Sequence, residues 1–251
     1  MGENADGKAF RQDEELVPLV TSASLACGFH AGDPRTLIKT VKLCRKWGVS
    51  VGAHPSFKDH EGFGRREMEV VPQDLVADLL YQISAVRGVA EALGMQLKHV
   101  KPHGALYNMA CVRRDYANVV VRVVKMVSPS LILIGLPGSE MERVAKRERV
   151  IYAKEGFPER GYLSDGTLAP RTMKGALITD PDRVAERASS MVSSGMVDSI
   201  DGGEVRLSVD TLCVHSDTPG VVEIASAIRK KLKLEGVTVK DISSFLRSEV
   251  R

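Results

Sequence analysis

The sequence predicts an α/β fold in which seven strands and the helices between them form a closed or nearly closed (β/α) barrel. Short apolar runs alternate with amphipathic segments along almost the whole chain, a pattern typical of βαβ units and a parallel sheet. Several runs are apolar on both faces, as in strands that are covered by helices on both sides. A chain of 251 residues suits one such barrel. We therefore expect a single domain over residues 1–251.

Four helices are predicted from residues that begin and end helices. Asp-Pro pairs, which supply an N-cap and a proline at the first helical position, open the first and third, and a glycine ends each of them. Pro72 opens the second helix, and an apolar stripe near the C-terminus defines the fourth. The predicted segments are 33–48, 72–94, 180–195 and the region around 224–232.

Seven strands are predicted between and around these helices, at residues 24–27, 49–53, 97–101, 131–134, 150–153, 197–200 and 212–215. Ionisable side chains follow several of these strands directly. In a parallel barrel all strand carboxyl ends face one rim, where the catalytic groups of barrel enzymes lie. The ionisable side chains expected at this rim are His30, His54, Lys101, His103, Glu155 and His215.

These side chains together predict an active site at the rim, although each alone has a plainer interpretation. A single histidine beside a turn is more often a hydrogen-bonded structural residue than a catalyst. Bringing several imidazoles, an amine and a carboxylate to one place, however, is costly in buried polarity unless a function requires it. The convergence, rather than any one residue, favours an enzyme.

Composition and motifs exclude several other classes of protein. The 35 basic and 32 acidic residues leave a formal charge of +3, too balanced for a protein that binds a nucleic-acid backbone. No apolar run approaches the roughly 18 to 20 residues of a membrane span, so we expect no membrane contact. The charged start of the chain lacks a secretory signal and the cysteines are widely spaced, which favours a cytoplasmic protein with reduced thiols. Neither a P-loop nor a dinucleotide-binding glycine motif occurs.

Seven short motifs resemble those of the LamB/YcsF family, and they follow one another in the family's order over nearly the whole chain. An eight-residue block such as ACGFHAGD is highly specific, and several blocks together leave little room for chance. The segments that carry the resemblance are 26–33 (ACGFHAGD), 52–57 (GAHPSF), 62–66 (GFGRR), 100–107 (VKPHGALY), 136–139 (LPGS), 160–162 (RGY) and 165–171 (DGTLAPR).

This resemblance implies a barrel of the glycoside hydrolase/deacetylase type. It also implies the hydrolytic opening of 5-oxo-L-proline to L-glutamate, with ATP as co-substrate and with 5-oxoprolinase subunits B and C as partners. Because the chain has no P-loop, ATP is expected to bind mainly on a partner subunit. The family opens with Asp-Leu-Asn-Ala-Asp followed by Gly-Glu, whereas this chain has Met-Gly-Glu-Asn-Ala-Asp at residues 1–6, followed by Gly7 and Lys8.

A five-membered lactam is a resonance-stabilised amide, so its opening requires an anion clamp, a base for water and a donor for the oxyanion. We hypothesise that Lys101 and His103 stabilise the oxyanion by charge or hydrogen bonds. Asp6 or Glu155 would activate water that His30 and His54 orient. The remaining residues expected to bind the substrate carboxylate or a phosphate are Asn4, Arg160, Arg171 and His215, of which the arginines offer guanidinium forks.

Two alternatives stay open. In the first, the chain is a metal-dependent amidohydrolase or deacetylase acting on a small amide or an acylated sugar. Asp6, His54 and His103 would then hold a divalent metal, because one carboxylate and two imidazoles with an open position suit a water-activating ion. In the second, the chain is a non-catalytic member of the complex, an interpretation that rests on the abbreviated N-terminus and Lys8.

Overall fold

The computed structural model describes residues 1–3 and 8–246, so the candidate residues Asn4 and Asp6 lie outside the described residues. The chain divides into two compact units. The first comprises Met1–Gly135, Ser139–Ala153 and Asp241–Arg251, and the second comprises Leu136–Gly138 and Lys154–Lys240. Within the described residues, no helix is both long enough and apolar enough to span a membrane.

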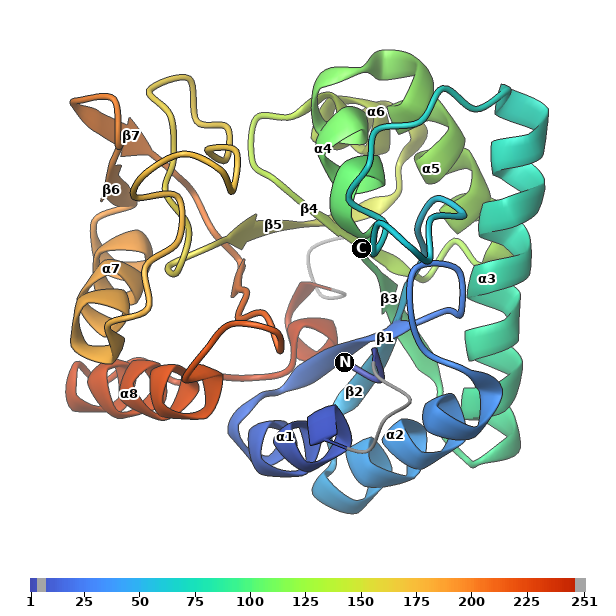
Figure 1. The fold of residues 1–251 in the computed structure, drawn as a ribbon, viewed down its shortest axis with the longest axis horizontal. Coiled ribbons are helices and arrows are strands. Elements are labelled where there is room, and N and C mark those ends of the chain that lie inside the picture. Colours follow the sequence, from blue (N-terminus) through green and yellow to red (C-terminus); the bar gives the residue numbers. More distant parts are fainter. Residues whose placement is uncertain (4–7, 247–251) are drawn as a thin grey trace. The chain divides into compact units, whose positions relative to one another are not determined.

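The first unit is built on parallel strands that follow one another in sequence order (Figure 1). Strands β1, β2, β3 and β4 pair in parallel, and Ala26 at the end of β1 lies opposite His54 at the end of β2. Four consecutive buried residues in β4 fit a strand that is covered on both faces. The bounds are β1 Ser22–Ala26, β2 Ser50–His54, β3 Leu97–Val100, β4 Ile132–Gly135 and β5 Ile151–Gly156, the last of which continues into the second unit.

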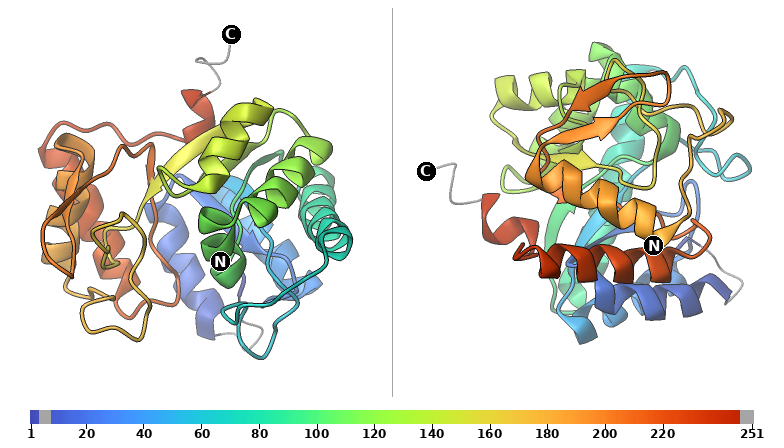
Figure 2. Two further views of the ribbon diagram at one scale, coloured as in Figure 1. Left: turned by 90° about the horizontal axis from the view of Figure 1, so that it is seen from above. Right: turned by 90° about the vertical axis from the view of Figure 1, so that its left-hand side faces the viewer.

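Helices of the first unit connect these strands, and α3 packs against both α2 and α5 (Figures 1 and 2). Helix α2 begins where the carboxylate of Asp33 accepts hydrogen bonds from the backbone N–H groups of Arg35 and Thr36, and it ends at Gly48, whose φ is 65°. The bounds are α1 Lys8–Leu16, α2 Pro34–Trp47, α3 Pro72–Ala92, α4 Gly104–Val112, α5 Arg114–Val127 and α6 Glu140–Glu148, with 3-10 turns at Val17–Leu19 and Ile242–Ser244.

The second unit has its own core, formed where helices α7 (Pro181–Ser193) and α8 (Val221–Leu234) pack side by side (Figure 2). The buried side chains of this core are Ile178, Val184, Ala188, Ile224, Ile228 and Leu232. Strand β8 (Thr211–Leu212) pairs in parallel with the end of β5, while β6 (Met196–Asp198) and β7 (Glu204–Arg206) form an antiparallel pair.

The predicted α/β class with sequential parallel strands is confirmed, and the four predicted helices are present as α2, α3, α7 and α8. Among the described residues, the parallel sheet has six strands in the order β1-β2-β3-β4-β5-β8 rather than seven. The predicted strand at 197–200 exists as β6 but pairs antiparallel with β7. The physical reason is the intervening turn, in which Gly202 and Gly203 take φ values of 103° and 95° and allow the chain to reverse.

A histidine cluster as the candidate active site

Three buried histidines from three neighbouring strands meet at one edge of the sheet in the first unit. His30 follows β1, His54 is the last residue of β2 and His103 follows β3. The rings of His30 and His103 are stacked, with centroids 3.8 Å apart and planes within 5° of each other. The ring of His54 meets that of His103 edge-on, at 4.7 Å. The predicted convergence of these three side chains is therefore present, whereas their catalytic role stays a prediction.

Two backbone carbonyls fix the protons on His54 and His103. The Nδ1 of His54 lies 2.6 Å from the carbonyl oxygen of Lys101, and the Nε2 of His103 lies 2.8 Å from that of Phe63. Because a carbonyl oxygen only accepts, each of these ring nitrogens carries the hydrogen. The other two nitrogens, His54 Nε2 and His103 Nδ1, face each other at 3.0 Å.

His30 is oriented by a serine that sequence reasoning did not single out. The hydroxyl of Ser56 donates to the carbonyl of Phe57 at 2.9 Å, so its oxygen accepts a hydrogen bond from His30 Nδ1, also at 2.9 Å. The opposite nitrogen, His30 Nε2, is buried and has no hydrogen-bond partner among the described residues. His30 thus presents an unprotonated nitrogen to the interior of the cluster.

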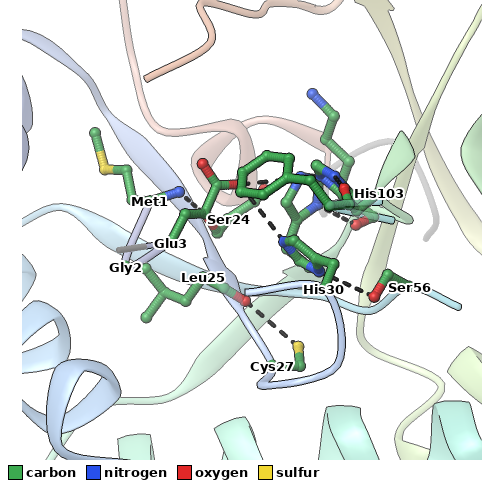
Figure 3. A network of polar contacts seen from close by, with 12 residues as sticks. Met1, Gly2, Glu3, Ser24, Leu25, Cys27, His30, Ser56 and His103 are labelled. Carbon is green, nitrogen blue, oxygen red and sulfur yellow. Dashed lines mark hydrogen bonds and ion pairs between the residues drawn. The ribbon is translucent and has the colours of Figure 1, made fainter. Parts of the chain in front are cut away.

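A carboxylate from Glu3 completes the cluster (Figure 3). Its Oε1 lies 3.5 Å from His30 Nε2 and 3.9 Å from His103 Nδ1. Glu3 reaches this position because residue Met1 lies alongside β1. The Met1 nitrogen donates to the carbonyl of Ser24, and the Met1 carbonyl accepts from the N–H of Ala26, each at 3.0 Å.

Burial sets the charge state of the cluster. Burial, reinforced by the neighbouring ring of His30, lowers the pKa of His103 to about 3. Burial and the nearby His103 hold the pKa of His54 well below its usual value, and burial also lowers that of His30. Burial alone would raise the pKa of Glu3, but the Met1 amino group and the surrounding histidines together hold it well below the usual value. Near neutral pH the cluster therefore combines neutral imidazoles with an ionised carboxylate.

A loop between β2 and α3 covers the cluster and is held by the buried carboxylate of Asp59. That carboxylate accepts hydrogen bonds from the backbone N–H of Gly62, at 2.9 Å, and from the backbone and guanidinium of Arg66. Phe63 consequently takes a φ of 54°, which is unusual for a bulky residue. This conformation directs the Phe63 carbonyl toward His103. Arg66 binds Asp59 while its side chain stays largely exposed.

Lys101 belongs to the same unit and lies directly after β3. Its side chain is buried, and its ammonium lies 5.9 Å from the ring centre of Tyr107. Its backbone carbonyl positions His54, as described above. A buried cation one residue beyond the strand is well placed to attract an anion. The oxyanion role of Lys101 itself stays a prediction.

The other predicted site residues lie in the second unit. Glu155 is buried in β5, opposite Thr211 of β8. The guanidinium of Arg160 is buried and donates to the backbone carbonyls of Ala169, at 2.7 Å, and Ala176, at 3.1 Å. These bonds fix Arg160 within its own unit. Arg171 is exposed.

His215, also in the second unit, forms a pair with Glu159 that sequence reasoning missed. One carboxylate oxygen of Glu159 accepts hydrogen bonds from both the backbone N–H and the Nδ1 of His215. The His215 ring stacks on Phe157 with centroids 5.7 Å apart. The second oxygen of the fully buried Glu159 has no hydrogen-bond partner among the described residues. An oriented imidazole backed by a carboxylate is suited to hydrogen bonding or proton transfer.

Buried imidazoles and a carboxylate lie together at the carboxyl ends of parallel strands. This arrangement places the chain among α/β proteins with a candidate hydrolytic site. The chain matches the model of the LamB/YcsF family over residues 1–247. It therefore belongs to the LamB/YcsF family, as the sequence motifs predicted.

Named relatives match almost the full length of the chain. It is 48% identical over 239 residues to the 5-oxoprolinase A subunit of Thermus thermophilus, a match that covers 95% of this chain and 96% of the relative. It is 45% identical over 245 residues to that of Natranaerobius thermophilus, covering 98% and 95%. The crystal structure of the lactam utilization protein from Thermus thermophilus superimposes with a TM-score of 0.90 at 47% identity, covering 96% of each chain.

Proposed function

We propose that this chain is the A component of a multi-subunit 5-oxoprolinase, which opens 5-oxo-L-proline to L-glutamate by hydrolysis with ATP as co-substrate and subunits B and C as partners. The observation that carries the proposal is the match at 48% identity to a protein named as the 5-oxoprolinase A subunit, over 95% of this chain. The similar solved structure is of a lactam utilization protein, and 5-oxoproline is a lactam. The chain is proposed to act in the cytoplasm.

Coupling to ATP overcomes the stability of the lactam. Transfer of the γ-phosphoryl group to the amide oxygen makes the ring carbonyl carbon electrophilic and turns its oxygen into a leaving group. Water then adds to that carbon, the C–N bond breaks with its electron pair going to nitrogen, and the nitrogen takes up a proton. The carboxyl phosphate that remains is attacked at its carbonyl carbon by a second water, and phosphate leaves with the former amide oxygen. The products are glutamate, ADP and phosphate. Such a sequence needs a proton acceptor for water and a positive group near the developing negative charge.

The described residues offer both groups. The unprotonated Nε2 of His30 is buried and is held in place through Ser56, so it is suited to accept a proton from attacking water. The ammonium of Lys101 is suited to stabilise the negative charge on the tetrahedral oxygen. Because burial keeps His103 neutral, we assign the positive charge of the predicted Lys101–His103 pair to Lys101.

The metal-dependent amidohydrolase is a second candidate function, favoured by the approach of Glu3 to His54 and His103. One carboxylate oxygen and two ring nitrogens from these residues lie within 4.8 Å of one another. These residues, with Glu3 in place of the predicted Asp6, would hold the metal. A bound divalent metal would supply a water of lowered pKa and polarise a carbonyl. The two functions differ in their requirement for ATP, because a metal-dependent amidohydrolase would cleave its amide without it.

The proposed function is tested by mixing the purified chain with subunits B and C, ATP and 5-oxoproline, and measuring glutamate. We expect glutamate formation to require both this chain and ATP. Replacing Lys101 by methionine should lower turnover about 100-fold. Lys98→Met is the matched control, because Lys98 lies on the same strand but directs its ammonium to Gln96 near the surface.

Two results would overturn the assignment. If glutamate forms equally fast without this chain, the chain is a non-catalytic member of the complex. If Lys101→Met is as active as Lys98→Met, the ammonium of Lys101 has no part in the reaction. Cleavage of an amide by the chain alone, without ATP and sensitive to chelators, would instead support the metal-dependent amidohydrolase.

A further inference from the structure

The inner nitrogens of His54 and His103 pose an electrostatic problem. Each neutral imidazole has one hydrogen, and in both rings that hydrogen is committed to a backbone carbonyl, of Lys101 in one case and Phe63 in the other. His54 Nε2 and His103 Nδ1 therefore direct lone pairs toward each other across 3.0 Å. Two lone pairs at this distance repel, so the geometry calls for a positive species beside them.

Two further acceptors surround the same point. The carboxylate oxygen of Glu3 lies 3.9 Å from His103 Nδ1. His30 Nε2 is fully buried, has no hydrogen-bond partner among the described residues and lies 3.5 Å from that same Glu3 oxygen. A single proton would satisfy only one contact between two acceptors. A multivalent cation can satisfy several acceptors at once.

We propose that Glu3, His54 and His103 bind a divalent transition-metal ion of the zinc type through Oε1, Nε2 and Nδ1, respectively. Around a tetrahedral ion with bonds of about 2.0 to 2.1 Å, ligand atoms lie about 3.3 Å apart. The observed separations of 3.0 Å between the two nitrogens and 3.9 Å between Glu3 Oε1 and His103 Nδ1 lie on either side of that value. Three protein ligands leave a fourth position open, which is typical of catalytic zinc sites.

The outer hydrogen bonds of the two histidines support a metal in particular. A metal-binding histidine almost always donates its other ring N–H to a carbonyl or carboxylate, which fixes the tautomer and the ring orientation. His54 and His103 both do so, through the carbonyls of Lys101 and Phe63. The proposed ligand set differs from the sequence-predicted one in its carboxylate, which comes from Glu3 instead of Asp6. It concerns binding alone and does not depend on the proposed lactam hydrolysis.

Metal binding to the full-length, untagged chain tests the proposal. After treatment with a chelator and its removal, the chain is titrated with Zn²⁺ in a calorimeter and with Co²⁺ while the visible absorption is recorded. We expect one equivalent of Zn²⁺ per chain and a Co²⁺ spectrum typical of tetrahedral coordination. Glu3→Gln, which keeps the side-chain shape, should weaken Zn²⁺ binding at least about tenfold. His60→Ala is the matched control, because His60 is exposed in a loop, and it should bind as the wild type does.

The wild-type titration alone can overturn the proposal, so the result does not depend on whether a variant folds. Absence of stoichiometric Zn²⁺ and Co²⁺ binding would show that the facing nitrogens share only a proton. Binding that Glu3→Gln leaves unchanged, or that His60→Ala abolishes, would place the metal elsewhere. None of these measurements uses turnover. Failure of the metal site would therefore leave the proposed 5-oxoprolinase function standing, and failure of that function would leave the metal site standing.

Discussion

Gly64 of the covering loop lies directly against two side chains of the histidine cluster, so its replacement by alanine should disturb the site directly. A Cβ atom at Gly64 would lie 2.8 Å from Cδ2 of His103 and 2.8 Å from Cβ of His30. The loop cannot easily move away, because the Gly64 carbonyl accepts a hydrogen bond from the N–H of Ala105 at 2.9 Å. We therefore predict that Gly64→Ala displaces at least one of the two stacked rings.

The expected loss of stability in Gly64→Ala has two causes, backbone strain and overpacking. The same substitution at a second glycine, Gly48, measures the strain alone. Gly64 has a φ of 68°, and an L-residue in this left-handed region costs about 1 to 2 kcal/mol. Overpacking against the two histidines adds about 1 to 3 kcal/mol. Gly48 has nearly the same φ, 65°, but a Cβ there meets nothing within 4 Å among the described residues. Gly48→Ala should therefore lose only the first part.

Urea unfolding and glutamate formation by the reconstituted complex measure the two effects. We expect both variants to unfold at lower urea than the wild type, with Gly64→Ala the less stable of the two. A displacement of about 1 Å in an active site can lower turnover about 100-fold. Gly64→Ala should thus lose activity, and Gly48→Ala should retain it. Equal stability of the two variants together with full activity of Gly64→Ala would refute the described packing of the loop on the histidines.

Two further predictions concern residues outside the cluster. Burial lowers the pKa of His99 to about 4, although the carboxylate of Asp241 opposes this shift, and the nearby Lys101 adds to it. The unfolded chain, with a histidine pKa of about 6.5, binds more protons between pH 6.5 and 4, so stability should fall with falling pH in this window, by up to about 1.4 kcal/mol per unit from this group. His99→Gln should reduce that slope in urea unfolding at pH 7 to 4.5, and an unchanged slope would contradict the assignment. Asp33→Ala removes the N-cap of α2, whose carboxylate accepts hydrogen bonds from two backbone N–H groups. It should lower the free energy of unfolding by about 1 kcal/mol while turnover stays the same; a loss of turnover at unchanged stability would assign Asp33 to the site instead.

Much of the fold was predictable from the sequence because its signals are local. The Asp33-Pro34 start and the Gly48 end of α2 need no information from distant residues. Helix α5, by contrast, was not predicted, because its run of valines favours a strand when considered alone. Packing of its apolar face against α3 and α6 decides in favour of a helix. The antiparallel pairing of β6 also depends on a partner, β7, that is only three residues long.

The meeting of His30, His54 and His103 was predictable because consecutive parallel strands deliver their carboxyl ends to the same edge. The tautomers were not, because they depend on which backbone carbonyls happen to face each ring. Glu3 was also missed, since the family motif points to Asp6, which lies outside the described residues. A stretch of three residues beside β1 gives no periodic signal, and hydrogen bonds of the Met1 and Gly2 backbone hold this stretch so that Glu3 reaches the cluster.

The unusual backbone conformation of Phe63 couples the position of the covering loop to the tautomer of His103. A bulky residue with a φ of 54° is strained by itself, and the bonds to Asp59 hold the loop in this shape. This backbone conformation directs the Phe63 carbonyl to His103 Nε2, which therefore carries the hydrogen. The lone pair of His103 is then on Nδ1, which faces His54. A loop displaced at Gly64 would release that constraint and allow His103 to change tautomer. The geometry thus links the two proposals at one residue, because Gly64→Ala should weaken Zn²⁺ binding as well as turnover, whereas Gly48→Ala should change neither.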